Sequence, residues 1–318
     1  MEQNRGLAKP EQLSERVQRL RAPNPGPMTL TGTNTYLVGS GREMVVIDPG
    51  PQIESHLQAI VAVSKAQQKP VRQILVTHGH PDHFPGAEQL SKMTGAPVVA
   101  YREATFPHQD SLDDRQRVTL DGATLLAIYT PGHAIDHLCF YLEEEQALFT
   151  GDNILGQGTT VIAPPKGDMS AYLASLRLLE ENWASARVIY GGHGPEVTAP
   201  DAKIREYILH RQARQQQLEE ALQRSSGTIP QLVEQIYQDV DRRLWPAAAR
   251  QVLAYLIMLE DEGRVTSEVI SSAELSATDV AMLNPATTGV DPVAAAELGI
   301  SGQPGSGLEK VKKYSLTT

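Results

Sequence analysis

Cysteine is almost absent from this sequence, and so are long apolar runs. The 318 residues include one cysteine, Cys139, so no disulfide can form within the chain, which suits a reducing compartment. The apolar neighbours of Cys139 indicate a buried core residue rather than a nucleophile. No stretch approaches the roughly 20 apolar residues of a membrane helix, and the N-terminus lacks the apolar core of a secretory signal. We therefore expect no membrane partner and a cytoplasmic location, or the mitochondrial matrix if the chain is eukaryotic.

Basic residues are also scarce. Lysine and arginine total 28 against 38 aspartates and glutamates, which gives a formal net charge of −10. An acidic chain is not attracted broadly to nucleic acid, so any binding of RNA must be local. The length and a hydrophobic content of 41% suffice for one large domain and a small one.

Short apolar runs alternate with helical periodicity over the first two thirds of the chain. This order favours a mixed α/β (α+β) domain built in layers. We expect strands near residues 35–38, 44–47, 74–76, 98–99, 125–129, 138–142, 147–150 and 188–190, and helices near 53–61, 86–93 and 171–179.

The pattern changes at Ala199. Three helical segments and a small hairpin over residues 199–271 resemble a winged-helix arrangement, but acidic and basic residues are nearly balanced there. Charge therefore favours a packing or substrate-capping domain over a nucleic-acid reader. Residues 272–318 are rich in Ala, Ser, Thr, Gly and Pro, which predicts a poorly packed, flexible tail. The large domain is expected to span residues 1–198.

Histidines and aspartates follow several of the expected strands. Such residues at strand ends are what a site for two metal ions requires. The seven candidate ligands are His78, His80, Asp82, His83, His133, Asp152 and His193. A lone histidine would be explained more simply as a core residue, but a set of this kind favours a metal site.

The chemistry of these side chains suits two Zn²⁺ ions, and Mn²⁺ or Fe²⁺ is also allowed. His78 and His80 alternate in extended chain, so both imidazoles can point the same way. Asp152 is the candidate bridge, because each carboxylate oxygen can bind one ion. Two ions roughly 3.5–4 Å apart can hold a hydroxide between them as a nucleophile near neutral pH.

Four motifs carry a family resemblance: THGHPDH at 77–83, TPGH at 130–133, GD at 151–152 and GGHG at 191–194. Together they resemble the metallo-β-lactamase superfamily. The resemblance implies an αββα sandwich with the metals at one edge, so that residues 1–198 form the catalytic domain. It also implies that one metal binds His78, His80, His133 and Asp152, and the other Asp82, His83, Asp152 and His193.

Further stretches resemble a group of endoribonucleases within this superfamily that cleave single-stranded RNA. These stretches are NPGPMTLTGTNTYLVG at 24–39, DNILGQGTT at 152–160 and GGHGPE at 191–196. The group usually has a bulky residue at the position of Gly79.

Other polar residues have two explanations each. Asp48 and His137 either support a ligand histidine or are ordinary strand-end residues. Four loop residues either contact substrate or stabilise the turns in which they lie. They are Thr33, Asn34, Thr159 and Thr160. We expect His56 and His210 to be solvated on polar helix faces.

The leading functional hypothesis is a phosphodiesterase that cleaves single-stranded RNA through the bridging hydroxide, with Asp82 and Asp152 as catalytic residues. The alternative is a thioesterase acting on a glutathione or acyl-carrier thioester, since the same ligands serve both reactions. A non-catalytic binding protein on a metal scaffold is a third hypothesis. The sequence leaves the oligomeric state open.

Overall fold

The computed structural model describes residues 8–271 and 310–317. The helices are α1 (Glu54–Gln67), α2 (Pro85–Thr94), α3 (Met169–Trp183), α4 (Pro200–Arg224), α5 (Ile229–Ile236) and α6 (Trp245–Asp261), with the 3-10 helix η1 at Arg242–Leu244. The strands are β1 (Glu11–Gln12), β2 (Val17–Arg21), β3 (Asn34–Val38), β4 (Met44–Ile47), β5 (Val71–Leu75), β6 (Val98–Tyr101), β7 (Asp110–Leu112), β8 (Arg117–Leu120), β9 (Ala123–Tyr129), β10 (Leu138–Leu142), β11 (Ala147–Gly151), β12 (Val188–Gly191), β13 (Gly227–Thr228), β14 (Val265–Ser271) and β15 (Lys310–Leu316).

The chain forms two compact units. The first contains residues 1–160 and 174–207, and the second contains residues 161–173 and 208–318. This division differs from the expected boundary at residue 198, because a segment distant in sequence packs into the second unit. Ile162 and Tyr172 in that segment are buried, and the Ile162 N–H donates a hydrogen bond to Gln251 Oε1 over 3.1 Å.

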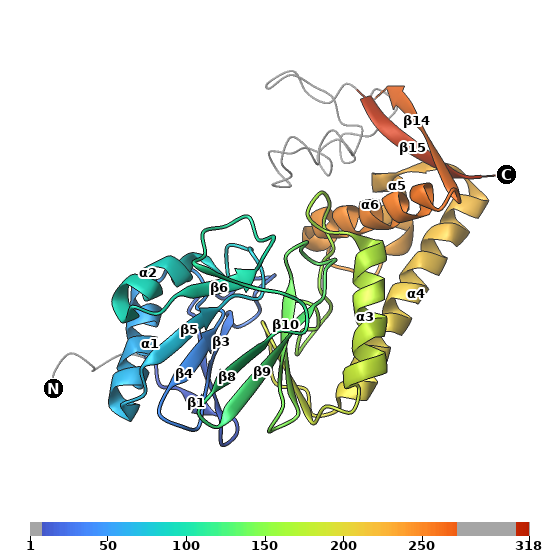
Figure 1. The fold of residues 1–318 in the computed structure, drawn as a ribbon. Coiled ribbons are helices and arrows are strands. Elements are labelled where there is room, and N and C mark those ends of the chain that lie inside the picture. The colour runs from blue at the N-terminus through green and yellow to red at the C-terminus, as the bar shows by residue number, and fades with distance from the viewer. Residues whose placement is uncertain (1–7, 272–309, 318) are drawn as a thin grey trace. The chain divides into compact units, whose positions relative to one another are not determined.

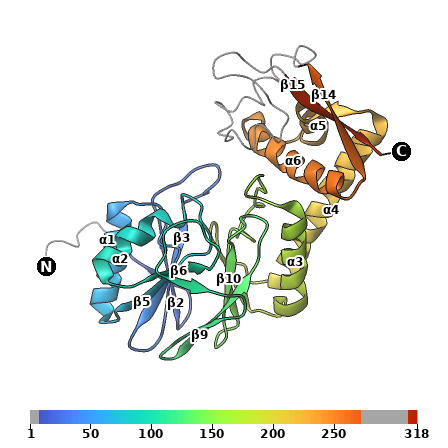
Figure 2. The ribbon, with the colours of Figure 1, turned by 45° about the horizontal axis from the view of Figure 1, so that its top comes forward.

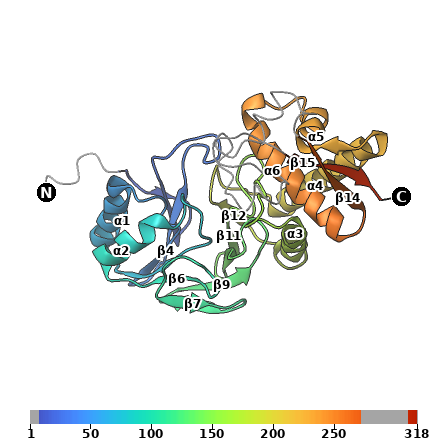
Figure 3. The ribbon, with the colours of Figure 1, turned by 90° about the horizontal axis from the view of Figure 1, so that it is seen from above.

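The first unit is built from two stacked sheets. One has the strand order β1-β2-β3-β4-β5-β6-β7 and the other β12-β11-β10-β9-β8. Helices α1 and α2 lie on the outer face of the first sheet, and α3 lies on the outer face of the second (Figure 1 and Figure 3). This arrangement confirms the expected αββα sandwich.

Alternation along the strands explains the layers. In β3, Tyr36 and Val38 face the second sheet and pack with residues such as Phe149, whereas Leu37 faces α1 and packs with Leu57. Because both faces of the first sheet are covered, its central strands are buried throughout, and their sequences read as continuous apolar runs.

The connections bring several strand ends to one edge. β4 and β5 are parallel neighbours, as are β11 and β12, so the loops after each pair leave from the same side of their sheet. An isolated bridge between Thr33 and His193 joins the two sheets at this edge. The candidate ligands therefore meet there although they are dispersed in the sequence.

The second unit contains the remaining helical segments and a small sheet with the order β13-β15-β14. The sheet lies beside α5 and α6 (Figure 2). This confirms the helical, winged-helix-like part expected after the large domain. None of the described helices is long and apolar enough to span a membrane.

The expectation of a poorly packed tail is wrong for its end. Residues 310–316 form β15, which pairs along its whole length with β14, and Val311 and Tyr314 are each 1% exposed. The pairing partner lies far back in the sequence, so local composition did not reveal it. Residues 272–309, which the same expectation covers, lie outside the described residues.

Candidate metal centre

Three histidines from two loops form the first cluster of the site. The Nε2 atoms of His78 and His133 each lie 2.9 Å from Nδ1 of His80. His78 and His80 follow β5, and His133 follows β9. Three imidazole nitrogens that face one another in this way are a donor set for a single cation.

The surroundings of His78 and His80 keep these two imidazoles neutral, which is the form that binds metals. Burial lowers the pKa of His78 well below its usual value, and the neighbouring His83, His80 and His133 lower it further. Burial, and then His133, lowers the pKa of His80 to about 3.

Two carboxylates and two histidines form the second cluster. His193 Nε2 lies 3.1 Å from Asp82 Oδ2, and His83 Nε2 lies 3.3 Å from Asp152 Oδ1. His83 Nε2 and Asp152 Oδ1 are both buried without a hydrogen-bond partner. Buried polar atoms of native proteins are rarely left unsatisfied, and a cation between these atoms would satisfy both. The residues present therefore fit a second metal ion.

Asp152 faces both clusters. Its Oδ1 lies 3.3 Å from His83 Nε2 and 3.4 Å from His193 Nε2, whereas its Oδ2 lies 3.7 Å from His133 Nε2. One carboxylate thus presents an oxygen to each cluster. This geometry is what a bridging ligand requires.

Without a cation, protons on the histidines balance the negative charge of the carboxylates in the second cluster. Burial would lower the pKa of His83, but the carboxylates of Asp152, Asp82 and Asp48 raise it well above its usual value. Burial likewise opposes protonation of His193, yet Asp152 and Asp82 raise its pKa to about 9. Burial would raise the pKa of Asp152, but His83 and His193 hold it well below its usual value. A bound cation would take the place of these protons.

Asp48 orients one candidate ligand from each cluster. Its Oδ2 accepts hydrogen bonds from His83 Nδ1 and from Thr77 Oγ1, both over 2.8 Å, and its Oδ1 accepts one from the Thr77 N–H. Because Thr77 donates its only hydroxyl hydrogen to Asp48, it accepts a hydrogen bond from His78 Nδ1, 2.9 Å away. Both histidines are thereby held with Nε2 free for a metal. Sequence reasoning considered Asp48 but missed Thr77, whose only signal was its position directly before His78.

The loop residues 33 and 34 lie inside the protein rather than on a substrate surface. Thr33 and Asn34 are 0% exposed. The Asn34 amide donates hydrogen bonds to the carbonyls of Gly191 (3.0 Å) and Gly194 (2.9 Å), which flank His193. Of their two explanations, the geometry favours support of the loop that carries His193.

Three further positions contact or border the first cluster. Thr160 is buried, and its Oγ1 lies 3.1 Å from Nδ1 of His133. Thr159, next to it, is half-buried. His137 is buried with its ring 5.0 Å from that of His78, and its Nδ1 lies 2.9 Å from Thr130 Oγ1. His137 therefore packs behind a candidate ligand.

The expectation for His56 is wrong. This side chain is 2% exposed and its Nε2 lies 2.9 Å from Thr35 Oγ1. Helix α1 packs so closely against the protein that two adjacent residues, His56 and Leu57, are both buried. His210 is half-buried. Cys139 is 0% exposed as expected, and burial raises the pKa of its thiol to about 12.

Glycines allow close packing around the ligands. A Cβ atom at Gly192 would collide with Asp152 Oδ1 and lie 2.7 Å from His83 Cε1. A Cβ atom at Gly79 would lie 2.8 Å from the Phe106 ring, which stacks on Phe84 with ring centroids 4.6 Å apart. An aromatic ring thus covers the backbone between His78 and His80. No motif or spacing in the sequence pointed to Phe106.

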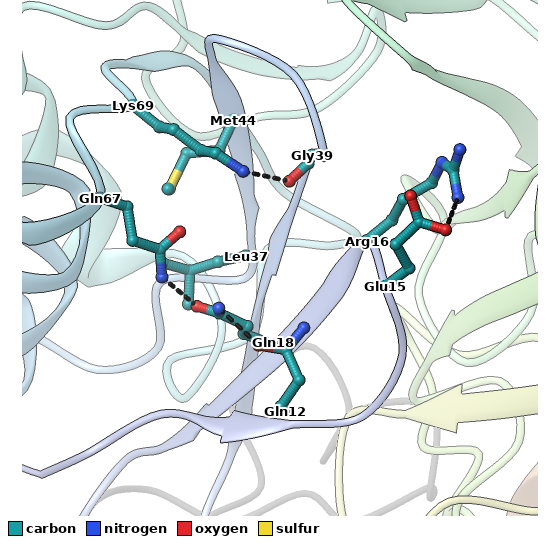
Figure 4. Close-up of a pocket in the computed structure, with 9 residues that line it drawn as sticks. All are labelled: Gln12, Glu15, Arg16, Gln18, Leu37, Gly39, Met44, Gln67 and Lys69. Carbon is teal, nitrogen blue, oxygen red and sulfur yellow. Dashed lines mark hydrogen bonds and ion pairs between the residues drawn. The ribbon is translucent and has the colours of Figure 1, made fainter.

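A surface pocket of the first unit lies away from this centre. It has a volume of about 110 Å³ and is lined by Gln12, Glu15, Arg16, Gln18, Leu37, Gly39, Met44, Gln67 and Lys69 (Figure 4). Gly39 follows the end of β3 and Met44 begins β4, whereas Thr33 and Asp48 lie at the opposite ends of these strands. The pocket is therefore at the far edge of the sheet from the ligands.

Comparisons with known proteins agree with the site. Residues 28–193 match the model of the Metallo-beta-lactamase superfamily, and residues 228–271 match that of the Beta-lactamase associated winged helix domain.

Individual relatives extend this agreement over most of the chain. An atrochrysone carboxyl ACP thioesterase of Aspergillus chevalieri is 36% identical over 77% of this chain and 82% of its own length. A beta-lactamase-like protein 2 homolog of Caenorhabditis elegans is 35% identical over 80% of this chain and 88% of its own. A crystal structure of a metallo-beta-lactamase family protein from Thermus thermophilus is similar with a TM-score of 0.68 and 25% identity, over 81% of this chain and 97% of that one.

Proposed function

This chain belongs to the metallo-beta-lactamase superfamily of hydrolases, and we propose that it hydrolyses an acyl thioester at the paired metal centre. The seven residues that would hold the two ions are His78, His80, Asp82, His83, His133, Asp152 and His193. Zn²⁺ is the ion that this mixture of imidazole and carboxylate suits best, and Mn²⁺ or Fe²⁺ is compatible with it.

The observation that carries this proposal is the absence of basic residues from the loops bearing the ligands. Residues 22–33, 78–84, 130–137, 152–160 and 192–198 contain no lysine or arginine. An RNA strand carries one negative charge per nucleotide, and proteins that bind it line the path of its backbone with positive charge. A neutral thioester carbonyl needs no such lining.

The same loops carry exposed apolar side chains. Met28 is 55% exposed and Ile135 is 62% exposed. Ile135 lies two residues after His133, and the Tyr129 hydroxyl donates a hydrogen bond to its carbonyl over 2.8 Å. Apolar side chains beside a hydrolytic centre suit an acyl group. The relative named as an acyl-carrier-protein thioesterase supports the same substrate class.

The reaction adds water across the C–S bond. Oxygen from water bonds to the carbonyl carbon, the C–S bond breaks, and a carboxylate, a thiol and one proton are released. Bound divalent ions lower the pKa of water and polarise the carbonyl. Asp82, whose side chain is 26% exposed, is the most accessible carboxylate of the site and would orient the water. Asp152 would hold the two ions together.

Hydrolysis of single-stranded RNA remains the second candidate. It is favoured by the similarity to the beta-lactamase-like protein 2 homolog and by the general use of metal pairs for phosphodiesters. The complete set of ligands gives no support to a non-catalytic scaffold.

A direct comparison of substrates tests the proposal. Zn²⁺-reconstituted protein is incubated with an acyl-pantetheine thioester, with lactoylglutathione and with labelled single-stranded RNA, each with and without a chelator. We expect chelator-sensitive thioester cleavage that Asp152→Asn abolishes. Cleavage of RNA alone would overturn the thioesterase proposal in favour of the second candidate, and no turnover of any substrate would overturn both.

A further inference from the structure

We propose that His56 and Thr35 form a hydrogen-bonded relay that positions Asp48, and through Asp48 the candidate ligand His83. This inference rests on the proposed metal centre, but it concerns residues that touch neither a metal nor a substrate. His56 lies on α1 and Thr35 on β3.

The direction of the relay follows from its hydrogens. Thr35 Oγ1 donates its single hydrogen to the Asp48 carbonyl over 2.6 Å, so it accepts from His56 Nε2, which lies 2.9 Å away. His56 therefore carries a proton on Nε2. Its Nδ1 is buried and has no hydrogen-bond partner, and burial, which lowers the pKa of His56 to about 4, favours the neutral form.

Asp48 is a residue whose backbone needs outside support. Its φ angle of 51° is in the left-handed region, which residues other than glycine adopt rarely. The backbone is held by its N–H, which donates to the Leu75 carbonyl over 2.9 Å, and by its carbonyl, which accepts from Thr35. Removing the Thr35 hydroxyl would loosen the residue whose carboxylate orients His83 and Thr77.

The His56 ring also lies close to the backbone of the same loop. Its Cδ2 and Nε2 atoms lie 3.7 Å from the position of a Cβ atom at Gly50. The Gly50 N–H donates a hydrogen bond to the His83 carbonyl over 3.0 Å. His56 is thus hydrogen-bonded to Thr35, which holds Asp48, and lies beside Gly50, which holds the His83 backbone. These two positions make it a positioning residue for the metal-binding loop.

Four variants test the relay. Thr35→Val and His56→Leu remove its hydrogen bonds while keeping apolar volume, and Thr35→Ser and His56→Gln restore a hydroxyl and an N–H donor. Ser64→Ala is the matched control, because Ser64 is a buried residue at the other end of α1 whose hydroxyl also donates to a backbone carbonyl, that of Lys69, over 2.7 Å. Zn²⁺ stoichiometry and affinity are measured by competition with a fluorescent chelator, and the unfolding free energy of each metal-free protein is measured in urea.

We expect Thr35→Val and His56→Leu to weaken the binding of Zn²⁺ about tenfold, the lower end of the range for residues that orient metal ligands. Thr35→Ser and His56→Gln should recover most of this loss, and Ser64→Ala should lower stability without changing Zn²⁺ affinity. If Thr35→Val changes affinity no more than Ser64→Ala does, the relay is overturned while the metal centre stands. A wild-type protein that takes up no Zn²⁺, Mn²⁺ or Fe²⁺ overturns both.

Discussion

His193 Nε2 lies 3.1 Å from Asp82 Oδ2, although the two residues follow strands of different sheets. Asp82 comes after β5 of the seven-stranded sheet, and His193 comes directly after β12 of the five-stranded sheet. The second cluster is therefore complete only when the two sheets have packed together. Formation of the site depends on the same apolar contacts, such as Tyr36 with Phe149, that hold the sandwich closed.

Loss of the Asp152 carboxylate, the proposed bridge, should remove activity. Asp152→Asn keeps the size of the side chain but replaces one charged oxygen by an amide nitrogen, which cannot bind a cation. We expect kcat/KM to fall by more than about 100-fold, beyond the range for residues that merely orient ligands, and bound Zn²⁺ to fall below two per chain by elemental analysis. The control is Asp121→Asn, an exposed residue that pairs with Arg42. Two tightly bound ions in Asp152→Asn would contradict the bridge.

Asp48 offers a graded test of ligand orientation. Asp48→Asn should fold, because asparagine tolerates the left-handed conformation found there, but it weakens the acceptor for His83 Nδ1. We expect about 10- to 100-fold weaker binding of Zn²⁺. Asp48→Ala should lose in addition about 1–2 kcal/mol of unfolding free energy from backbone strain. Equal affinities for wild type and Asp48→Asn in a chelator competition would show that this carboxylate has no orienting role.

The packing of Gly192 predicts that a single methyl group disrupts the centre. In Gly192→Ala the new Cβ would collide with Asp152 Oδ1 and crowd His83, so the two ligands must separate. We expect activity and Zn²⁺ uptake to fall together. Gly227→Ala is a suitable control, since its Cβ would meet Leu232 at an ordinary 3.4 Å. A crystal structure of the Gly192 variant with both ions in place would refute this interpretation.

Salt concentration separates the two candidate substrates. If the substrate is a thioester, the absence of cations from the ligand-bearing loops predicts that kcat/KM changes less than about twofold between roughly 50 and 200 mM salt. A polyanion held by several phosphate contacts would lose about 10³-fold or more in affinity over this range. Steep salt dependence of turnover would therefore count against the thioester.

His56 should make stability sensitive to acid. Burial lowers its pKa in the folded protein to about 4, below the value of about 6.5 in the unfolded chain, so the unfolded state binds the proton more readily. The stabilising effect of the neutral ring is present above about pH 6.5 and is lost as the pH falls toward 4.

The comparison that isolates this effect is between wild type and His56→Leu, both metal-free, in urea titrations at several pH values. At about 1.4 kcal/mol per pKa unit, the wild type should lose up to about 3 kcal/mol relative to the variant between pH 6.5 and 4. A constant difference across this range would mean that His56 is protonated equally in both states.

Much of the site was predictable because its residues follow apolar strands. The seven candidate ligands stand in the loops that follow such runs, and strands of an α/β sandwich end at a common edge, so their convergence could be expected. Asp48 and His137 could not be decided, since a polar residue at a strand end looks the same whether or not it touches a ligand.

Other features depend on depth and on distant partners. His56 lies beside Leu57 and one helical turn from Ile60, at the border of the apolar face of α1. A histidine there can be buried or solvated, and the depth to which α1 packs decides that it is buried. Phe106 reaches Gly79 from a loop beyond the next strand. Neither fact has a local signature in the sequence.

The position of β15 has a practical consequence for anyone who shortens the chain. This strand separates β13 from β14, so its removal would leave those two without a common partner and would strip the buried ring of Tyr314 from the small unit. A version cut after residue 271 would keep every candidate metal ligand and still expose a broken sheet. A loss of solubility in this version would then reflect damage to the small sheet and not to the candidate metal centre.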